Sequence, residues 1–258
     1  MHRGMAAPNT ALRVVLTCAA SLTLAALASF ALAAPAASVR EVFASRLGDH
    51  ANGPVIGRYE IDEGGAFVFD RSAPHPLLKF DDSPEIWVLQ AAPGPRGDMI
   101  FRNDLGEPML RATRIGGMTV FTDKRPGGSA AALNGASPPL RLGSLSPAGR
   151  FARFYQASVR ASRAAQHQVE FETLEDAEPA TAAEIADAAM VACEAMVDMA
   201  SRPASRRILA RIADIVIAQG ARPAAVLQGR VLTITIVPAQ GIFGRPSSRR
   251  IEHAAGAR

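Results

Sequence analysis

The sequence predicts an α+β fold, in which an N-terminal antiparallel β-meander packs with a C-terminal half of about three helices and one or two strands. Residues 54–122 alternate between short apolar runs and turn residues, which is the pattern of a meander. Residues 149–240 contain longer stretches with helical periodicity that end at glycine or proline. A stretch rich in Gly, Pro, Ser and Ala, residues 123–148, separates the two halves.

Residues 1–33 have the order of a secretory signal peptide. A polar start with arginine precedes an apolar run over residues 14–34, which ends around the small-x-small triplet 31–33 that signal peptidase recognises. We therefore expect cleavage near Ala33 by the general secretory route and a periplasmic protein. Because the apolar run is about as long as a membrane span, a single uncleaved N-terminal anchor is the alternative.

The N-terminal half is expected to begin with a partly ordered leader over residues 34–53. Seven strands parted by turn residues are then predicted, at 55–61, 66–70, 77–80, 85–90, 99–103, 108–115 and 118–122. The Gly116-Gly117 pair favours a hairpin turn, because both turn positions need positive φ. Residues 123–148 are expected to be a surface linker or mobile loop, since their composition buries little.

The C-terminal half is predicted to contain three helices, at 150–167, 180–200 and 204–219. Two strands are expected, at 168–174 and 226–237. Within the second, residues 231–237 are strongly β-branched, so they are a candidate to complete the sheet of the first half and join both halves into one domain. Residues 241–258 are expected to form a polar, arginine-bearing tail.

Composition excludes several classes of protein. The formal charge of +4 falls to +2 when Arg3 and Arg13 leave with the signal, and a near-neutral exported chain is a poor candidate for nucleic-acid binding. Of two cysteines, Cys18 leaves with the signal and Cys193 remains, which excludes an internal disulfide and a zinc site of several cysteines. No histidines are paired at ligand spacing, so no metal and no cofactor are predicted.

The helix predicted over residues 180–200 carries the candidate site residues. At about 100° per residue, its acidic residues fall in one narrow strip and most other positions are apolar. These acids are Glu184, Asp187, Glu194 and Asp198. They form either a carboxylate cluster for a cation or acid–base chemistry, or the solvated face of an otherwise buried helix, which is the favoured interpretation. Cys193 lies on the apolar arc, which indicates an inert core residue.

Charge is distributed unevenly along the C-terminal half. Residues 164–201 contain nine acids and no Lys or Arg, whereas residues 202–258 contain ten Arg and two acids. We expect the acidic helix to contact a nearby arginine, namely Arg206, Arg207 or Arg211. The alternative is that the arginines of the tail contact anionic lipid headgroups or an acidic partner. These arginines are Arg245, Arg249, Arg250 and Arg258.

Six segments of the chain resemble a known but uncharacterised family. They are residues 64–72, 96–98, 103–108, 110–114, 186–192 and 244–248. The family that they resemble consists of exported proteins from GC-rich Gram-negative bacteria, and the likeness extends over most of the chain after the signal. Because the family is of unknown function, the resemblance implies export and supplies no catalytic residues.

These observations predict an exported, non-catalytic envelope or binding protein of unknown ligand. Signatures of catalysis are missing from the sequence: there is no Gly-x-Ser-x-Gly elbow, no His-Glu-x-x-His and no phosphate-binding loop. One alternative is a periplasmic, hydrolase-like enzyme whose site forms only in three dimensions, where Asp187, Glu194 or His167 converge. The other is a membrane-anchored or membrane-contacting envelope protein. The sequence does not identify a partner, and the two candidates are an envelope protein and an anionic membrane surface.

Overall fold

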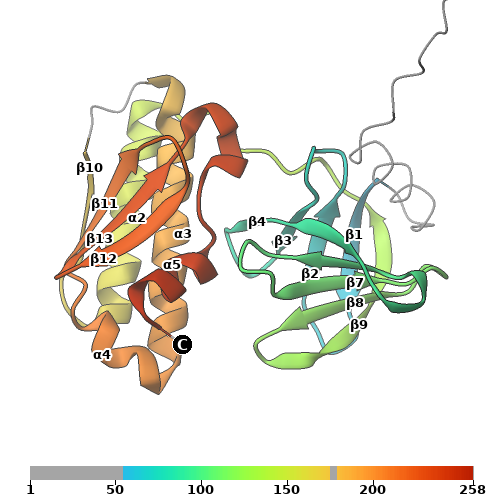
Figure 1. The fold of residues 1–258 in the computed structure, drawn as a ribbon. Coiled ribbons are helices and arrows are strands. Elements are labelled where there is room, and N and C mark those ends of the chain that lie inside the picture. Colours follow the sequence, from blue (N-terminus) through green and yellow to red (C-terminus); the bar gives the residue numbers. More distant parts are fainter. Residues whose placement is uncertain (1–54, 175–178, 258) are drawn as a thin grey trace, which may run out of the picture. The chain divides into compact units, whose positions relative to one another are not determined.

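The computed structural model describes residues 55–174 and 179–257 (Figure 1). The predicted signal, leader and N-terminal anchor lie outside these residues. All of the described residues belong to one compact unit, which spans Val39–Arg258. None of the helices within the described ranges combines the length and the apolar character that crossing a bilayer requires.

Nine strands form one antiparallel sheet in the N-terminal half, which confirms the predicted meander. The strands are β1 (Ile56–Ile61), β2 (Ala66–Asp70), β3 (Leu77–Phe80), β4 (Ile86–Val88), β5 (Gln90–Pro93), β6 (Met99–Arg102), β7 (Pro108–Ala112), β8 (Met118–Thr122) and β9 (Arg125–Ala136). Their order in the sheet is β4-β3-β2-β1-β9-β8-β7-β6-β5. The seven predicted strands are all present, with their ends shifted by a few residues.

Both edges of this sheet come from one bent stretch of chain. Strand β4 pairs with β3, and β5, which follows it after Leu89, pairs with β6 at the other end of the strand order. Leu89 is fully buried and its amide donates to the carbonyl oxygen of Pro76 at 2.8 Å. Because consecutive residues supply the two edges, the sheet has to curve back on itself.

The structure differs from the expectation for the Gly/Pro-rich segment. Residues 125–136 form β9, which is a central strand between β1 and β8 rather than part of a linker. Small residues suit this place, because a Cβ atom on Gly128 would lie 2.5 Å from Cγ2 of Thr119 on β8. Gly128 also has a φ of 87°, which glycine adopts at low cost. Backbone pairing on both sides, which composition does not reveal, holds this segment in the sheet.

Aromatic side chains fill the interior of the curved sheet. Phe67 and Phe69 on β2 are buried, as are Tyr59 on β1 and Phe101 on β6. The rings of Tyr59 and Phe67 are stacked with centroids 5.3 Å apart, and those of Phe69 and Phe101 meet edge to face at 4.8 Å. Such pairs add roughly 0.5–1.5 kcal/mol beyond the area they bury.

The C-terminal half forms a second sheet with helices. Its elements are α2 (Pro147–Ala165), β10 (Glu170–Thr173), α3 (Ala182–Ser201), α4 (Arg206–Leu209), β11 (Asp214–Gln219), β12 (Ala224–Gln228), β13 (Val231–Ile236) and α5 (Ser248–Ala255), with the 3-10 turns η2 (Pro179–Thr181), η3 (Pro203–Ser205) and η4 (Pro238–Gly244). The strand order is β10-β11-β13-β12. Strands β10, β11 and β13 are parallel to one another, and the edge strand β12 is antiparallel to β13.

One helix prediction and one prediction about strand pairing were wrong for this half. The helix expected over residues 204–219 is helical only at Arg206–Leu209, and residues 214–219 form β11. This strand contains Ile215, Val216 and Ile217, whose branched side chains favour a central strand. Residues 231–236 do not complete the first sheet, because β13 pairs with β11 and with β12.

The expected polar tail is instead ordered. Residues 248–255 form α5, which is capped by Ser247, whose side chain accepts a hydrogen bond from the amide of Arg250 at 3.1 Å. Ile251 on this helix is fully buried. One apolar position per turn is therefore enough to dock α5, although most of its residues are polar.

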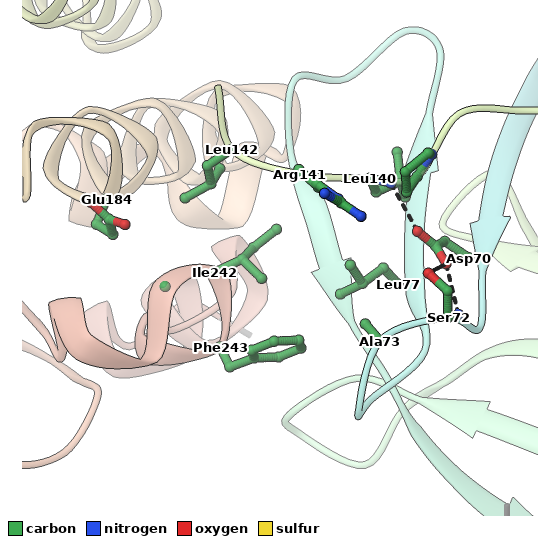
Figure 2. Close-up of a pocket in the computed structure, with 12 residues that line it drawn as sticks. Asp70, Ser72, Ala73, Leu77, Leu140, Arg141, Leu142, Glu184, Ile242 and Phe243 are labelled. Carbon is green, nitrogen blue, oxygen red and sulfur yellow. Dashed lines mark hydrogen bonds between the residues drawn. The ribbon is translucent and has the colours of Figure 1, made fainter. Parts of the chain in front are cut away.

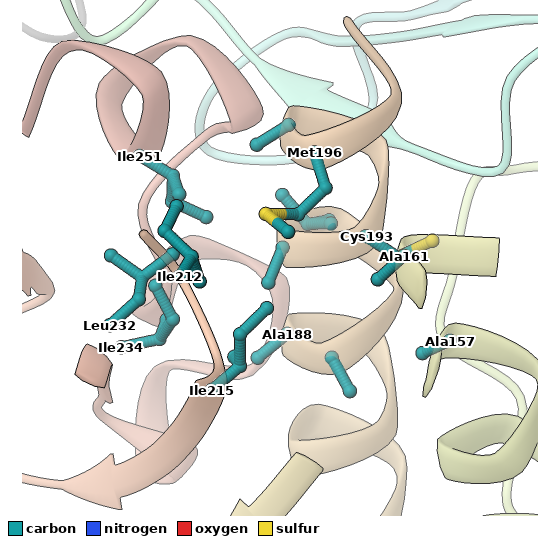
Figure 3. Close-up of a cluster of buried hydrophobic side chains, with 14 of the residues drawn as sticks. Ala157, Ala161, Ala188, Cys193, Met196, Ile212, Ile215, Leu232, Ile234 and Ile251 are labelled. Atoms are coloured by element: carbon teal, nitrogen blue, oxygen red, sulfur yellow. The ribbon is translucent and has the colours of Figure 1, made fainter. Parts of the chain in front are cut away.

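The core of the second half surrounds α3 (Figure 3). On one side Met196 and Ala188 point toward the isoleucines of the sheet, such as Ile215. On the other side Cys193 points toward α2, where Ala157 and Ala161 are fully buried. These small residues allow α2 and α3 to approach closely, and α3 is buried on most of its circumference, as predicted.

Candidate functional site

The acidic strip of α3 is not the solvated face that the sequence favoured. Asp187 and Glu194 each have only 11% of their side chain exposed. The expectation fails because side chains from the first sheet, from α2 and from the segment before α5 pack against the strip. Its four carboxyl groups consequently have different surroundings.

Asp187 belongs to a buried cluster with Arg245 and Glu85. The side chain of Arg245 is 4% exposed and that of Glu85 is 1% exposed. Nε–H of Arg245 donates to Oδ2 of Asp187, and Nη2–H donates to the carbonyl oxygen of Ile86 at 2.9 Å. Nη1 lies 3.7 Å from Oε1 of Glu85, which also accepts from the amide of Ser248 at 3.0 Å. One arginine thus binds acidic residues from both halves of the chain.

Burial sets the proton affinity of this cluster. It raises the pKa of Glu85 from 4.5 to about 7, against the opposing effects of Arg245 and of the hydrogen bond from Ser248. The raised pKa means that the interior disfavours the ionised carboxylate of Glu85 even though Arg245 lies beside it. The cluster is therefore sensitive to pH in the neutral range.

The other arginines near the C-terminus also pair within the chain. Nε–H of Arg250 donates to Oδ2 of Asp104 at 2.8 Å, and Arg249 pairs with Asp123 and with Glu252. These residues are thus occupied by acids of their own chain, and Arg258 lies outside the described residues.

The ion pairs that α3 forms in the described ranges are with Arg160 and Arg245. The expected pairs with Arg206, Arg207 or Arg211 were wrong. Arg160 precedes α3 and lies outside the arginine-rich block 202–258, whereas Arg245 lies inside this block but was assigned to the tail. Proximity along the chain was therefore a poor guide to the partners of this helix.

Glu194 and Asp198 lie at the C-terminal part of the strip. Oε1 of Glu194 is 2.6 Å from Nη2 of Arg160 on α2. Burial raises the pKa of Glu194, and it raises the pKa of Asp198 from 3.8 to about 6, with smaller contributions from the charges of Glu252 and Glu194. Asp82, in the turn between β3 and β4, raises both pKa values as well. The carboxylates of Asp82, Glu194 and Asp198 thus lie close enough to disfavour one another's ionised forms, and Arg160 and Arg202 are the cations that oppose this effect.

Glu184, the first acid of the strip, lines a cavity of about 320 Å³ (Figure 2). Four separate segments form its walls: the end of β2 with the turn into β3, residues 139–142, the first turn of α3, and the end of η4. The lining residues are Asp70, Ser72, Ala73, Leu77, Pro139, Leu140, Arg141, Leu142, Glu184, Gly241, Ile242 and Phe243. Most of these residues are apolar, so the few polar side chains in the wall determine which polar groups of a ligand the cavity can bind.

The two carboxyl groups of the cavity differ in their free capacity. Asp70 is buried and accepts from the amide and the hydroxyl of Ser72, at 2.8 and 2.6 Å, and from the amide of Leu140 at 2.8 Å. It therefore fixes residues 139–142 to the first sheet. Oε2 of Glu184 is buried and has no hydrogen-bond partner in the part of the chain that the structure describes. Of the two carboxyl groups that line the cavity, Glu184 is therefore the one with an oxygen free to accept a hydrogen bond.

The residues that the enzyme alternative required do not converge. Asp187 and Glu194 bind different arginines, and the ring of His167 contacts the carbonyl oxygens of Ala165 and Ile212 at 3.0 and 2.8 Å. Burial raises the pKa of Cys193 to about 12, so its thiol is not activated as a nucleophile.

No group of three or more His, Cys, Asp or Glu within residues 55–174 and 179–257 is arranged to hold a metal ion. In the acidic turn over residues 81–85, Asp81 instead pairs with Arg58 at 2.6 Å, and the hydroxyl of Ser83 accepts from the amide of Glu85. The turn thus uses its carboxylates for contacts within the protein.

The family described as "Domain of unknown function (DUF4908)" matches residues 38–255. The chain belongs to this family. This match confirms the resemblance to an uncharacterised family. The DUF4908 region contains both sheets and all of the residues that line the cavity. No curated protein and no solved structure matches the chain.

Two important residues of the DUF4908 region escaped the sequence reasoning. Glu85 was predicted only as the first residue of a strand, and Arg245 only as part of a tail. A usable signal was present after Arg245, because Ser247 precedes Ile251 and Ala255 at helical spacing and is a favoured N-cap residue. That pattern would have predicted α5 and, with it, an ordered place for the arginines.

Proposed function

We propose that the chain is an exported, non-catalytic binding protein of the cell envelope, which holds a small ligand in the cavity beside Glu184. The supporting observation is that Glu184 lines the cavity and that its buried Oε2 has no donor among the described residues. Leaving a buried acceptor unpaired costs about 1–3 kcal/mol. A ligand that donates to this oxygen would recover that cost.

The walls define the chemistry of the ligand. Leu77, Leu142, Ile242 and Phe243 offer an apolar surface and Glu184 offers one acceptor, whereas the other charged lining residue besides Asp70, Arg141, is exposed to solvent. The volume of about 320 Å³ lies at the small end of ligand pockets, which hold roughly 300–1,000 Å³. We therefore propose a small ligand with an apolar body and one ammonium or N–H group.

Binding of a simple aryl amine tests the proposal. Phenethylamine, phenethyl alcohol and phenylacetate share an apolar body and differ in the polar group, so isothermal titration should rank the amine first. A hydrogen bond to a charged group contributes about 1.5–3 kcal/mol, so Glu184→Gln should weaken amine binding roughly 10- to 100-fold. Glu172→Gln, which changes an exposed carboxylate on β10, is the matched control. Amine binding that is absent, or equal in Glu184→Gln, would refute the ligand site.

The export part of the proposal depends on residues 1–33. Expression of the full chain with a C-terminal tag in a Gram-negative host, followed by intact mass measurement and fractionation, tests it. A mass lacking about residues 1–33 in the soluble periplasm supports cleavage near Ala33. A full-length mass in the membrane fraction would favour the anchored alternative.

A further inference from the structure

The cavity beside Glu184 also has a cationic side chain in its wall. Arg141 lines the cavity and is exposed, so it lies where the cavity opens to solvent. No acidic side chain in the described ranges forms an ion pair with Arg141, whereas the exposed Arg58 on β1 pairs with Asp81. The cavity thus offers a guanidinium group in addition to the acceptor of Glu184.

The backbone on either side of Arg141 is held in place. The amide of Leu140 donates to Oδ2 of the buried Asp70 at 2.8 Å. Leu140 and Leu142 also pack against the apolar cluster that contains Ile242. Arg141 therefore extends from an anchored segment, and only its own side chain has to become ordered when it binds a ligand.

Glu184 and Arg141 lie apart from each other in the wall. Figure 2 shows Leu142 and Ile242 between them. Glu184 belongs to the first turn of α3, where the helix dipole favours a negative charge. Opposite charges that are separated by apolar side chains match a ligand with opposite charges at the two ends of an apolar chain.

Burial decides which end of such a ligand lies at which residue. Oε2 of Glu184 is buried and has no donor among the described residues, so an ammonium group there forms a charge-assisted hydrogen bond shielded from water. Arg141 is exposed, so a carboxylate beside it remains partly hydrated and loses little solvation. A methyl group at this end would gain neither an ion pair nor complete burial.

We propose that the ligand of this cavity is a zwitterion, with an ammonium group and a carboxylate at opposite ends of a short aliphatic chain. Glu184 binds the ammonium group and Arg141 binds the carboxylate. The inference rests on the proposed function, because it assigns the second end of the ligand that Glu184 holds. A guanidinium group pairs with a carboxylate through two parallel N–H···O bonds, so Arg141 selects zwitterions over simple amines.

Two isomers test the proposal by isothermal titration of the purified protein. ε-Aminocaproate has its charged groups at opposite ends of the chain, whereas norleucine has both on one carbon, so ε-aminocaproate should bind more tightly. Its advantage should shrink at about 0.5 M salt, because salt screens an exposed ion pair.

Variants of Arg141 identify the group that binds the carboxylate. Arg141→Gln should weaken binding of ε-aminocaproate about two- to fivefold, which is the range of an exposed ion pair. It should not weaken binding of hexylamine, which lacks the carboxylate. Arg141→Lys keeps the charge and should retain most of the affinity. Arg222→Gln, at an exposed arginine outside the cavity lining, is the control and should bind as the parent does.

The outcomes separate this inference from the proposed function. Equal binding of norleucine and ε-aminocaproate overturns the zwitterion, as does an Arg141→Gln variant that binds ε-aminocaproate like the parent or loses hexylamine equally. Hexylamine binding that Glu184→Gln weakens would still support the amine site in these cases. Failure of both hexylamine and ε-aminocaproate to bind would overturn the ligand site and the zwitterion together.

Discussion

Replacing Arg245 by Met should be among the most destabilising single changes in this chain. Methionine is shorter than arginine but fills the space of its aliphatic stem, so the substitution removes the charge and the hydrogen bonds while keeping much of the packing. It leaves Glu85, which is 1% exposed, and Asp187, which is 11% exposed, without their shared cation. The carbonyl oxygen of Ile86 also loses its donor.

The expected magnitude follows from this burial. Removing one partner of a buried ion pair costs about 3–5 kcal/mol, because the remaining charge is uncompensated. For a domain of this size, 1 kcal/mol shifts the melting temperature by about 2–4 °C. Arg245→Met should therefore lower the melting temperature by roughly 6–20 °C.

Urea unfolding followed by circular dichroism measures the effect, with Arg222→Met as the matched control. Arg222 is exposed, so its substitution should change the free energy of unfolding by less than about 0.5 kcal/mol. Adding Glu85→Gln and Asp187→Asn to Arg245→Met should restore much of the lost stability, because both orphaned charges disappear. The argument is refuted if Arg245→Met behaves like Arg222→Met, or if the added substitutions only destabilise further.

Two further predictions concern pH and packing. The pKa values of Glu85 and Asp198 rise on folding to about 7 and about 6, so their stabilising protonation is complete below about 4 and is lost as pH rises through 6 to 7. The urea midpoint should consequently fall between pH 5 and pH 7, and Glu85→Gln should flatten this slope; a midpoint that rises over this range would contradict the assignment. Gly244→Ala should cost about 1–3 kcal/mol, because its Cβ would lie 2.1 Å from the carbonyl oxygen of Val237, whereas Gly143→Ala has open space and should be neutral. Equal midpoints for these two glycine variants would show that the η4 turn can relax.

The sequence predicted most of the first sheet because its signals are local. Alternation in segments such as 66–70 fixes which side chains enter the core, and glycine pairs such as Gly116-Gly117 fix where strands end. The segment 125–136 lacked both signals. Its place as β9 depends on pairing with β1 and β8, and composition carries no information about backbone pairing.

The acidic strip at the candidate site shows the same difference between what local sequence patterns predict and what long-range contacts decide. Helical periodicity alone determined that Glu184, Asp187, Glu194 and Asp198 share one face of α3. Their partners were beyond reach, because Arg245 lies 58 residues from Asp187 and Glu85 lies 163 residues from Ser248.

The sequence by itself thus determined the α+β class, the helix that carries the acids and the isolation of Cys193 in the core. The tertiary structure decided that the acidic strip is covered and paired with arginines. It also left one acceptor of Glu184 unpaired beside a cavity among the described residues. The physical reason is that periodicity is a property of neighbouring residues, whereas burial and ion pairing depend on which distant segments pack together.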